Sequence, residues 1–251
     1  MDSIKYKGLN LTYNHPHDLA AIIECAVLDV YSLKYIPEGS VVVDLGAGIG
    51  EFTVMASRKV GNQGRVIAIE PSPKDYQTLI VNVGQNHCDN VITVNVGVSD
   101  REEKLQLEFK DQRFTADSKP LIEIINDLKI SINEIKFMKM DIEGAEKFVV
   151  PSSLDIIRNL DSLAMEIHGG YWKDLIPLMK GYGFTFKRVT RSYYLFRALI
   201  NAVTKPVSTY NLYQKFRDSG ENPGIKKMIN GIKISKSDDL VVGVFRKNRS
   251  Y

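Results

Sequence analysis

Short apolar runs alternate with amphipathic stretches along residues 41–190 of this 251-residue chain. The runs are apolar on both faces, which favours strands buried between two layers of helices. The stretches between them place apolar side chains at helical spacing. The pattern predicts strands at 41–45, 65–70, 91–97, 135–141, 162–168 and 184–190, and helices at 50–60, 73–85, 120–128, 144–158 and 171–181.

Strands that alternate with helices of 10–15 residues form crossover units and a parallel sheet. A further apolar run at 240–245 predicts a last strand, which we expect to pair with strand 184–190 as in a hairpin. We therefore expect an α/β fold in which the last strand of a mostly parallel sheet is antiparallel.

Two segments lie outside this alternation. Residues 18–35 carry apolar side chains at helical spacing, so we expect residues 1–39 to form an N-terminal helical extension. Residues 191–238 are too many for a simple turn, and we expect a mostly helical, lid-like insertion in the domain formed by residues 40–251.

A glycine-rich turn, Asp44 to Gly50, follows the first strong strand. Glycine allows positive φ and close approach of a ligand, and ligands of open α/β sheets bind at the carboxyl ends of the strands. The spacing departs from the G-x-G-x-x-G pattern for dinucleotides, because Glu51 stands where the third glycine belongs. An acid at this place would repel a pyrophosphate.

Two carboxylates accompany the turn. Asp44 ends the first strand and can accept a hydrogen bond from an ammonium group, while Glu70 ends the second strand and can accept both hydroxyls of a ribose. A tight turn and a solvated strand end are the alternatives for these residues taken singly. Together they favour a nucleoside cofactor that carries an amino-acid group.

At this point the chain resembles the FkbM family of class I methyltransferases. The resemblance spans about residues 40–190 and rests on the segments 43–50, 68–73, 95–100, 138–146 and 166–168. The most distinctive is Met138–Glu146, which is similar to the K-x-D-x-E-G-x-E motif of the family.

The resemblance implies a Rossmann-like class I methyltransferase fold with a seven-stranded sheet, and methyl transfer from S-adenosylmethionine. The usual acceptor is an oxygen of a sugar-like or other small hydroxylated molecule. The expected cofactor-binding residues are Asp44, Gly46, Ala47, Gly48, Glu70, Pro71, Val96, Gly97 and Asp141.

The candidate catalytic residues are Asp141, Glu143 and His168. Asp141 and His168 end neighbouring predicted strands, so both would face the cofactor crevice, and a histidine is suited to proton removal near neutral pH. Alternatives are acids that stabilise a helix start and a histidine that caps a strand end. These residues with Glu166 also form a possible divalent-metal set, but we assign no metal ligand.

The acceptor is less constrained. Residues 141–144 read D-I-E-G and lack the N/D-P-P-Y/F element of enzymes that methylate base amino groups. Residues 187–233 hold ten lysine and arginine residues against two acids, hence +8 in a chain of net charge +3, with aromatic residues between them. A solvated helical insertion, a small anionic acceptor and RNA all fit this charge. A cofactor-binding protein without catalysis is a further alternative.

The remaining sequence features indicate the compartment. Cys25 and Cys88 have no metal-ligand spacing and are interpreted as free thiols. The N-terminus lacks a signal-peptide pattern, and no apolar run approaches the length of a membrane span. We expect a cytoplasmic protein.

Overall fold

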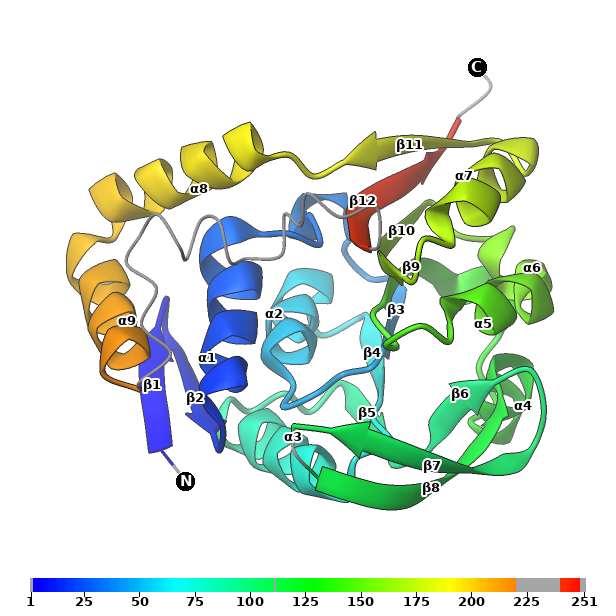
Figure 1. Ribbon diagram of the computed structural model, residues 1–251, viewed down its shortest axis with the longest axis horizontal. Coiled ribbons are helices and arrows are strands. Elements are labelled where there is room, and N and C mark those ends of the chain that lie inside the picture. The colour runs from blue at the N-terminus through cyan, green and yellow to red at the C-terminus, as the bar shows by residue number, and fades with distance from the viewer. Residues whose placement is uncertain (1, 111, 220–239, 249–251) are drawn as a thin grey trace.

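The computed structural model describes residues 2–110, 112–219 and 240–248. Its centre is a seven-stranded sheet in the order β11-β12-β10-β9-β3-β4-β5 (Figure 1). The strands are β3 (Val41–Leu45), β4 (Arg65–Ile69), β5 (Val91–Val94), β9 (Ile135–Met140), β10 (Ser162–His168), β11 (Phe184–Arg188) and β12 (Leu240–Lys247). Only β12 runs antiparallel to its neighbours. The predicted fold class is confirmed.

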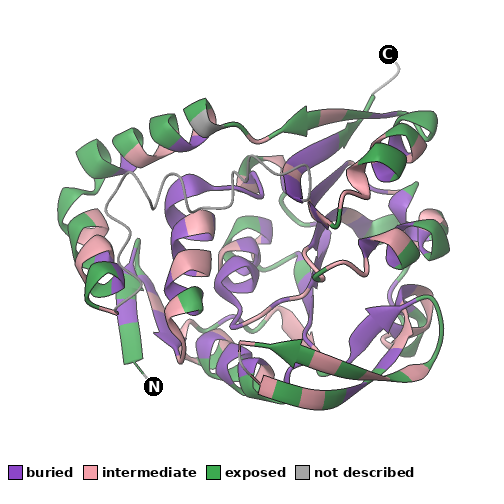
Figure 2. Ribbon diagram, viewed as in Figure 1, coloured by how far each residue is buried: buried purple, intermediate pink, exposed green. Residues whose placement is uncertain are grey.

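Helices cover both faces of this sheet (Figure 1). One face holds α1 (Pro16–Ile22), α2 (Glu51–Val60) and α3 (Pro73–Gln85), and the other holds α4 (Leu121–Asp127), α5 (Glu146–Ser152), α6 (Leu154–Ile157) and α7 (Trp172–Gly181). Successive strand residues point to opposite faces: Phe137 packs in the first layer and Met138 in the second, and both are fully buried. This explains the apolar runs, and Figure 2 shows the central strands as buried.

The strand order reverses at β3, which pairs with β4 on one side and β9 on the other. A ligand crevice forms at the carboxyl ends of the strands at such a point. The turns after β3 and β9 meet there, and the backbone N–H of Asp141 donates to the carbonyl of Leu45 at 3.1 Å.

The N-terminal segment differs from the prediction. It begins with a hairpin of β1 (Asp2–Tyr6) and β2 (Leu9–Tyr13), which turns at Lys7 and Gly8 with positive φ, as a two-residue hairpin turn requires. The helix predicted over 18–35 is shorter. After α1 comes a π-helical turn (Ile23–Leu28) that stops at Asp29 in the left-handed region, and a separate 3₁₀ turn spans Leu33–Tyr35.

Residues 97–120 form a second sheet that the sequence pattern did not predict. It contains β6 (Gly97–Ser99), β7 (Glu103–Phe109) and β8 (Gln112–Pro120) in the order β6-β8-β7. The strand predicted over 91–97 therefore ends at Val94, and β6 belongs to the second sheet.

Two helical segments are interrupted. The helix predicted over 144–158 starts at Glu146, because Glu143 and Gly144 have positive φ, and it breaks into α5 and α6 near Pro151.

The predicted insertion contains α8 (Arg191–Thr204) and α9 (Pro206–Asp218), while 220–238 lies outside the described residues. A short 3₁₀ turn (Ile132–Glu134) precedes β9. No helix within the described ranges has the length and apolar character needed to span a membrane.

Candidate active site

A cavity of about 480 Å³ opens at the carboxyl ends of β3, β4 and β9. The volume lies in the range of small-molecule sites, which is about 300–1,000 Å³. Among the residues predicted from sequence, the cavity is lined by Gly46, Gly48, Glu70, Pro71, Val96, Gly97, Asp141 and Glu143. Asp44, Ala47 and His168 lie behind this lining.

The glycine turn is held tightly against the neighbouring strand ends. Gly46 has φ +70°, and a Cβ at this position would collide with the backbone carbonyl of Asp141. The N–H of Gly48, which has φ +55°, donates to Glu70 Oε2 at 2.7 Å. Position 46 requires both a positive φ and the absence of a Cβ, and only glycine provides the two together. The backbone of the turn can therefore lie at the cavity wall.

Glu70 is fixed by two backbone amides. Besides Gly48, the N–H of Ser72 donates to Oε1 at 2.8 Å. Burial raises the pKa of Glu70 to about 7, although these two hydrogen bonds oppose the rise. The carboxylate thus lines the cavity in a fixed orientation and titrates near neutral pH.

Asp44 faces the interior of the fold. Its side chain is completely buried, accepts a hydrogen bond from Thr53 Oγ1 at 2.5 Å, and lies 3.3 Å from Lys139 Nζ. Lys139 also donates to the carbonyls of Leu45 and Gly46. Burial acts to lower the pKa of Lys139, but the Asp44, Asp141 and Glu51 carboxylates raise it, so the ammonium group stays charged. The Asp44 and Lys139 pair therefore supports the turn from behind.

Glu51 is a buried acid in the cavity wall. Its Oε1 lies 3.9 Å from Cys25 Sγ, and its Oε2 has no hydrogen-bond partner in the described part of the chain. Burial raises the pKa of Glu51 to about 8. Glu51 is thus largely neutral at pH 7, and the charge repulsion expected from the sequence requires a higher pH.

The strand ends of β9 and β10 bring four acids around His168. The ring Nδ1 lies 3.0 Å from Glu146 Oε1, and Nε2 lies 3.4 Å from Glu143 Oε2, 3.8 Å from Glu166 Oε1 and 4.0 Å from Asp141 Oδ1. Burial acts to lower the pKa of His168, but the Glu146 hydrogen bond and the other carboxylates raise it above its ordinary value.

Tyr31 adds a group that the sequence did not indicate. Its hydroxyl donates to Asp141 Oδ2 at 2.9 Å and lies 3.5 Å from Glu166 Oε2. The side chain follows the π-helical turn and is buried. It orients both carboxylates toward the cavity edge from a position more than a hundred residues away in sequence.

The hairpin of β7 and β8 forms one wall of the cavity, through Leu105, Leu107, Phe109 and Phe114. At its tip, Lys110 Nζ lies 2.5 Å from Asp18 Oδ1 and 2.9 Å from Asp75 Oδ2. All three side chains are nearly buried, and the aspartates belong to the first turns of α1 and α3. Figure 1 shows the hairpin extending past β5 toward α3.

The described helices of the insertion, α8 and α9, lie mostly outside the cavity lining. In the described residues, α9 packs on β1 and α1, and only Phe216 of the insertion lines the cavity. Arg197 pairs with Asp29 at 3.4 Å, and Lys215 donates to the carbonyl of Ser3. Lys226, Lys227 and Lys233 lie outside the described residues.

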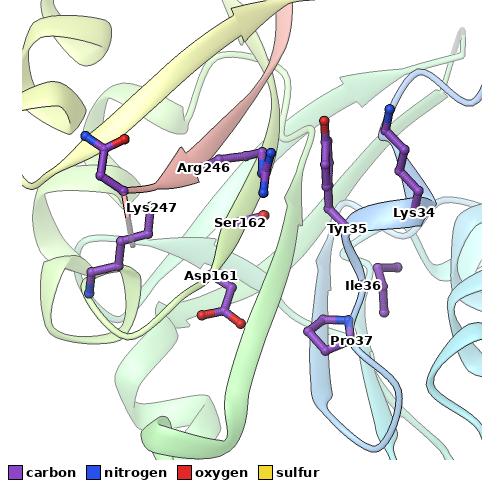
Figure 3. Close-up of a pocket in the computed structure, with 9 residues that line it drawn as sticks. Lys34, Tyr35, Ile36, Pro37, Asp161, Ser162, Arg246 and Lys247 are labelled. Carbon is purple, nitrogen blue, oxygen red and sulfur yellow. The ribbon is translucent and has the colours of Figure 1, made fainter. Parts of the chain in front are cut away.

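A second hollow, of about 580 Å³, lies at the opposite end of β10 (Figure 3). It is lined by residues such as Lys34, Asp161 and Arg246, and the Arg246 guanidinium lies 4.3 Å from the centre of the Tyr35 ring. None of the residues predicted for the site lines it. The candidate chemistry therefore belongs to the first cavity, although the second is larger.

The family model for the Methyltransferase FkbM domain matches residues 44–186. The chain belongs to the FkbM methyltransferase family. This match contains the glycine turn, Glu70, Asp141 and His168, and it confirms the predicted family.

More distant likenesses accompany this membership. The chain is 23% identical over 164 residues to Methyltransferase 1 of Beauveria bassiana (strain ARSEF 2860), a match that covers 52% of this chain and 62% of that protein. This chain is 16% identical to M. jannaschii TYW2 in complex with AdoMet, with TM-score 0.48 and coverage of 98% and 86%. The chain is 13% identical to a putative rRNA-methylase from Clostridium thermocellum, with TM-score 0.48. That match covers 95% of this chain and 100% of the other chain.

Proposed function

We propose that the cavity binds S-adenosylmethionine with its ribose on Glu70. The observation that carries this proposal is the pair of backbone hydrogen bonds that aim the Glu70 carboxylate into the cavity. Gly46 and Gly48 would lie against the methionine part, and Val96 and Gly97 would border the adenine, with Pro71 beside the ribose.

Asp44 and Ala47 take an indirect part in this arrangement. Asp44 holds Lys139, and Lys139 binds the carbonyls of the turn. The N–H of Ala47 donates to the carbonyl of Ile69 at 3.0 Å, which ties the turn to β4. Neither of them lines the cavity, whereas Asp141, the other aspartate predicted from the sequence, does line it and would contact the cofactor.

For the chemistry we propose methyl transfer to a hydroxyl oxygen of a small, sugar-like acceptor. The acceptor oxygen forms a bond to the methyl carbon while the carbon–sulfur bond breaks and its electron pair passes to sulfur. The hydroxyl proton passes to Asp141 and then to His168 when substrate binding shortens the distance between Asp141 Oδ1 and His168 Nε2, which is 4.0 Å in the unliganded chain. Glu143 would orient the acceptor from the cavity rim, where its side chain is 54% exposed.

The size of the site supports a small acceptor. The hairpin of β7 and β8 closes one side of the cavity, and the described basic residues of the insertion lie elsewhere. An RNA duplex or loop needs an open basic surface beside the reacting centre. A small hydroxylated molecule fits better than RNA into a cavity of about 480 Å³ that the methyl donor also occupies.

Turnover of labelled S-adenosylmethionine with hydroxylated acceptors tests this function. We expect His168→Ala to lower kcat at least about tenfold, the lower range for a proton-transfer group, with unchanged affinity for S-adenosylhomocysteine. His87→Asn, an exposed histidine with positive φ, is the control. Absence of methyl transfer in the native protein, with intact cofactor binding, would indicate a protein that binds the cofactor without catalysis.

A further inference from the structure

His168 is oriented by a fully buried acid. Its Nδ1 lies 3.0 Å from Glu146 Oε1, which also accepts the N–H of Ile142 at 3.2 Å. Glu146 has no exposed surface. Because an ionised carboxylate only accepts hydrogen bonds, Nδ1 carries a hydrogen and Nε2 of a neutral ring presents a lone pair.

The acidic groups around Nε2 would be stabilised by a positive charge at this atom. This atom is covered and has no hydrogen-bond partner in the described part of the chain. Carboxylate oxygens of Glu143, Glu166 and Asp141 lie 3.4, 3.8 and 4.0 Å from it. A lone pair that faces three such oxygens is repelled unless a proton or a metal cation lies between them.

The spacing of these atoms suits coordination. Ligand atoms of Asp141, Glu143 and His168 all lie within 4.8 Å of one another. Around an octahedral cation with bonds of about 2.1 Å, neighbouring ligand atoms are about 3 Å apart and opposite ones about 4.2 Å apart. A histidine that ligates a metal usually donates its other ring N–H to a carboxylate, which is the role of Glu146 here.

We propose that Asp141, Glu143 and His168 bind a divalent cation at the acceptor side of the cavity. The imidazole ligand favours Mn²⁺ over Mg²⁺. Asp141 and Glu143 line the cavity, so coordination positions opposite the protein ligands face the place where an acceptor binds.

The use of this cation rests on the proposed methyl transfer to oxygen. The cation selects an acceptor that carries an oxygen next to its reacting hydroxyl, such as a vicinal diol, because two oxygens can then coordinate together. Coordination lowers the pKa of the hydroxyl. The cation occupies Asp141 and His168 and so replaces the proton path through these two residues that the proposed function describes. The hydroxyl proton then passes to Glu166, which also lines the cavity.

Binding of Mn²⁺ to the full chain, followed by the electron paramagnetic resonance signal of the free ion, tests the site. We expect one Mn²⁺ per chain, with at least tenfold weaker binding in Glu143→Gln and His168→Ala. Glu102→Gln is the control, since Glu102 is 64% exposed and Glu143 is 54% exposed. Thermal unfolding and S-adenosylhomocysteine binding establish that each variant is folded. Equal Mn²⁺ affinity of the native protein and both variants would overturn the proposed cation site.

Turnover with a vicinal diol acceptor, with and without EDTA, tests the use of the cation separately. Loss of turnover in EDTA and its recovery with Mn²⁺ support the proposal. Full turnover in EDTA overturns the role in acceptor binding. If Mn²⁺ binds as expected but no hydroxylated acceptor is methylated, the cation site stands and the proposed function fails.

Discussion

Two buried glutamates in the cavity wall differ in how their charge is satisfied. Glu70 accepts two backbone N–H groups, whereas Glu51 has the Cys25 thiol on one oxygen and no hydrogen-bond partner on the other within the described residues. Burial raises the pKa of both. Glu70 therefore has a fixed orientation that suits ligand binding, whereas ionisation of Glu51 destabilises the folded state.

Affinity for S-adenosylhomocysteine should depend on the ionisation of Glu70. With a pKa of about 7, the carboxylate is protonated below that pH and accepts the ribose hydroxyls poorly, so binding weakens as the pH falls from 8 to 6. Glu70→Gln should bind about tenfold more weakly at pH 8, which corresponds to about 1.4 kcal/mol. Titration calorimetry at both pH values measures this.

The control for this experiment is Glu134→Gln, an exposed acid in the turn before β9. It should show native affinity and the native pH dependence. Retention of the full pH dependence by Glu70→Gln would assign the titration to another group and remove Glu70 from the ribose.

Glu51 should make the protein less stable as the pH rises. Its pKa is about 8 in the folded chain against 4.5 as the ordinary value. Between these values the folded state holds a proton that the unfolded state has lost, so the contribution of Glu51 to stability is greatest below pH 4.5 and falls up to pH 8. From pH 6 to pH 9 the loss is about 2 to 3 kcal/mol, and Glu51→Gln should lack it. Urea unfolding of the native protein and of Glu51→Gln at pH 6 and pH 9 tests this. An equal loss of stability in both proteins would show that Glu51 is not the titrating group.

At the scale of elements, the hairpin of β7 and β8 is attached to the domain through its tip. Lys110 joins Asp18 and Asp75, which lie in the first turns of two different helices. Removing one partner of a buried ion pair costs about 3–5 kcal/mol because the other charge stays buried. Lys110 thus joins the tip of the hairpin wall to both helices.

Lys110→Met should loosen this hairpin. We expect faster amide hydrogen exchange over residues 103–120 and at least a tenfold loss of affinity for S-adenosylhomocysteine. Lys104→Met is the control, because Lys104 lies on the same hairpin and pairs with Asp117 while both side chains are more than 70% exposed, where an ion pair contributes little. Identical exchange in the two variants would show that the tip contact does not hold the wall.

The elements of the main sheet were predictable because their strands are buried on both faces, which produces continuous apolar runs. The hairpins β1–β2 and β7–β8 were missed for the opposite reason. The exposure of β7 alternates along its length, and its polar residues resemble those of a loop. The Lys7-Gly8 turn was the available signal for the first hairpin.

The site was predictable where the chemistry is local. Gly46, Gly48 and Glu70 follow one another along the chain and meet at one sheet edge. Tyr31 and Lys110 act across long separations in sequence, so no local pattern reveals them. Lys139 could have been found, since a lysine within an apolar strand is rarely buried unless it is paired.

At the scale of the molecule, the described helices of the basic insertion, α8 and α9, line the cavity through Phe216 alone. For a small acceptor, KM should change little between 50 and 200 mM salt. An RNA acceptor held by 6–10 phosphate contacts would lose about 10³–10⁵ in affinity over this range. Steady-state kinetics at the two salt concentrations distinguish these cases, and a steep rise in KM would support the RNA alternative.

The central claim is that the cavity at the ends of β3, β4 and β9 holds the methyl donor. A crystal structure with S-adenosylhomocysteine tests it most directly. We predict the ribose hydroxyls on Glu70, the amino-acid group near the turn at Gly46 and Gly48, and the sulfur facing Asp141. Density for the ligand in the hollow lined by Lys34 and Arg246, or a ribose remote from Glu70, would contradict the account.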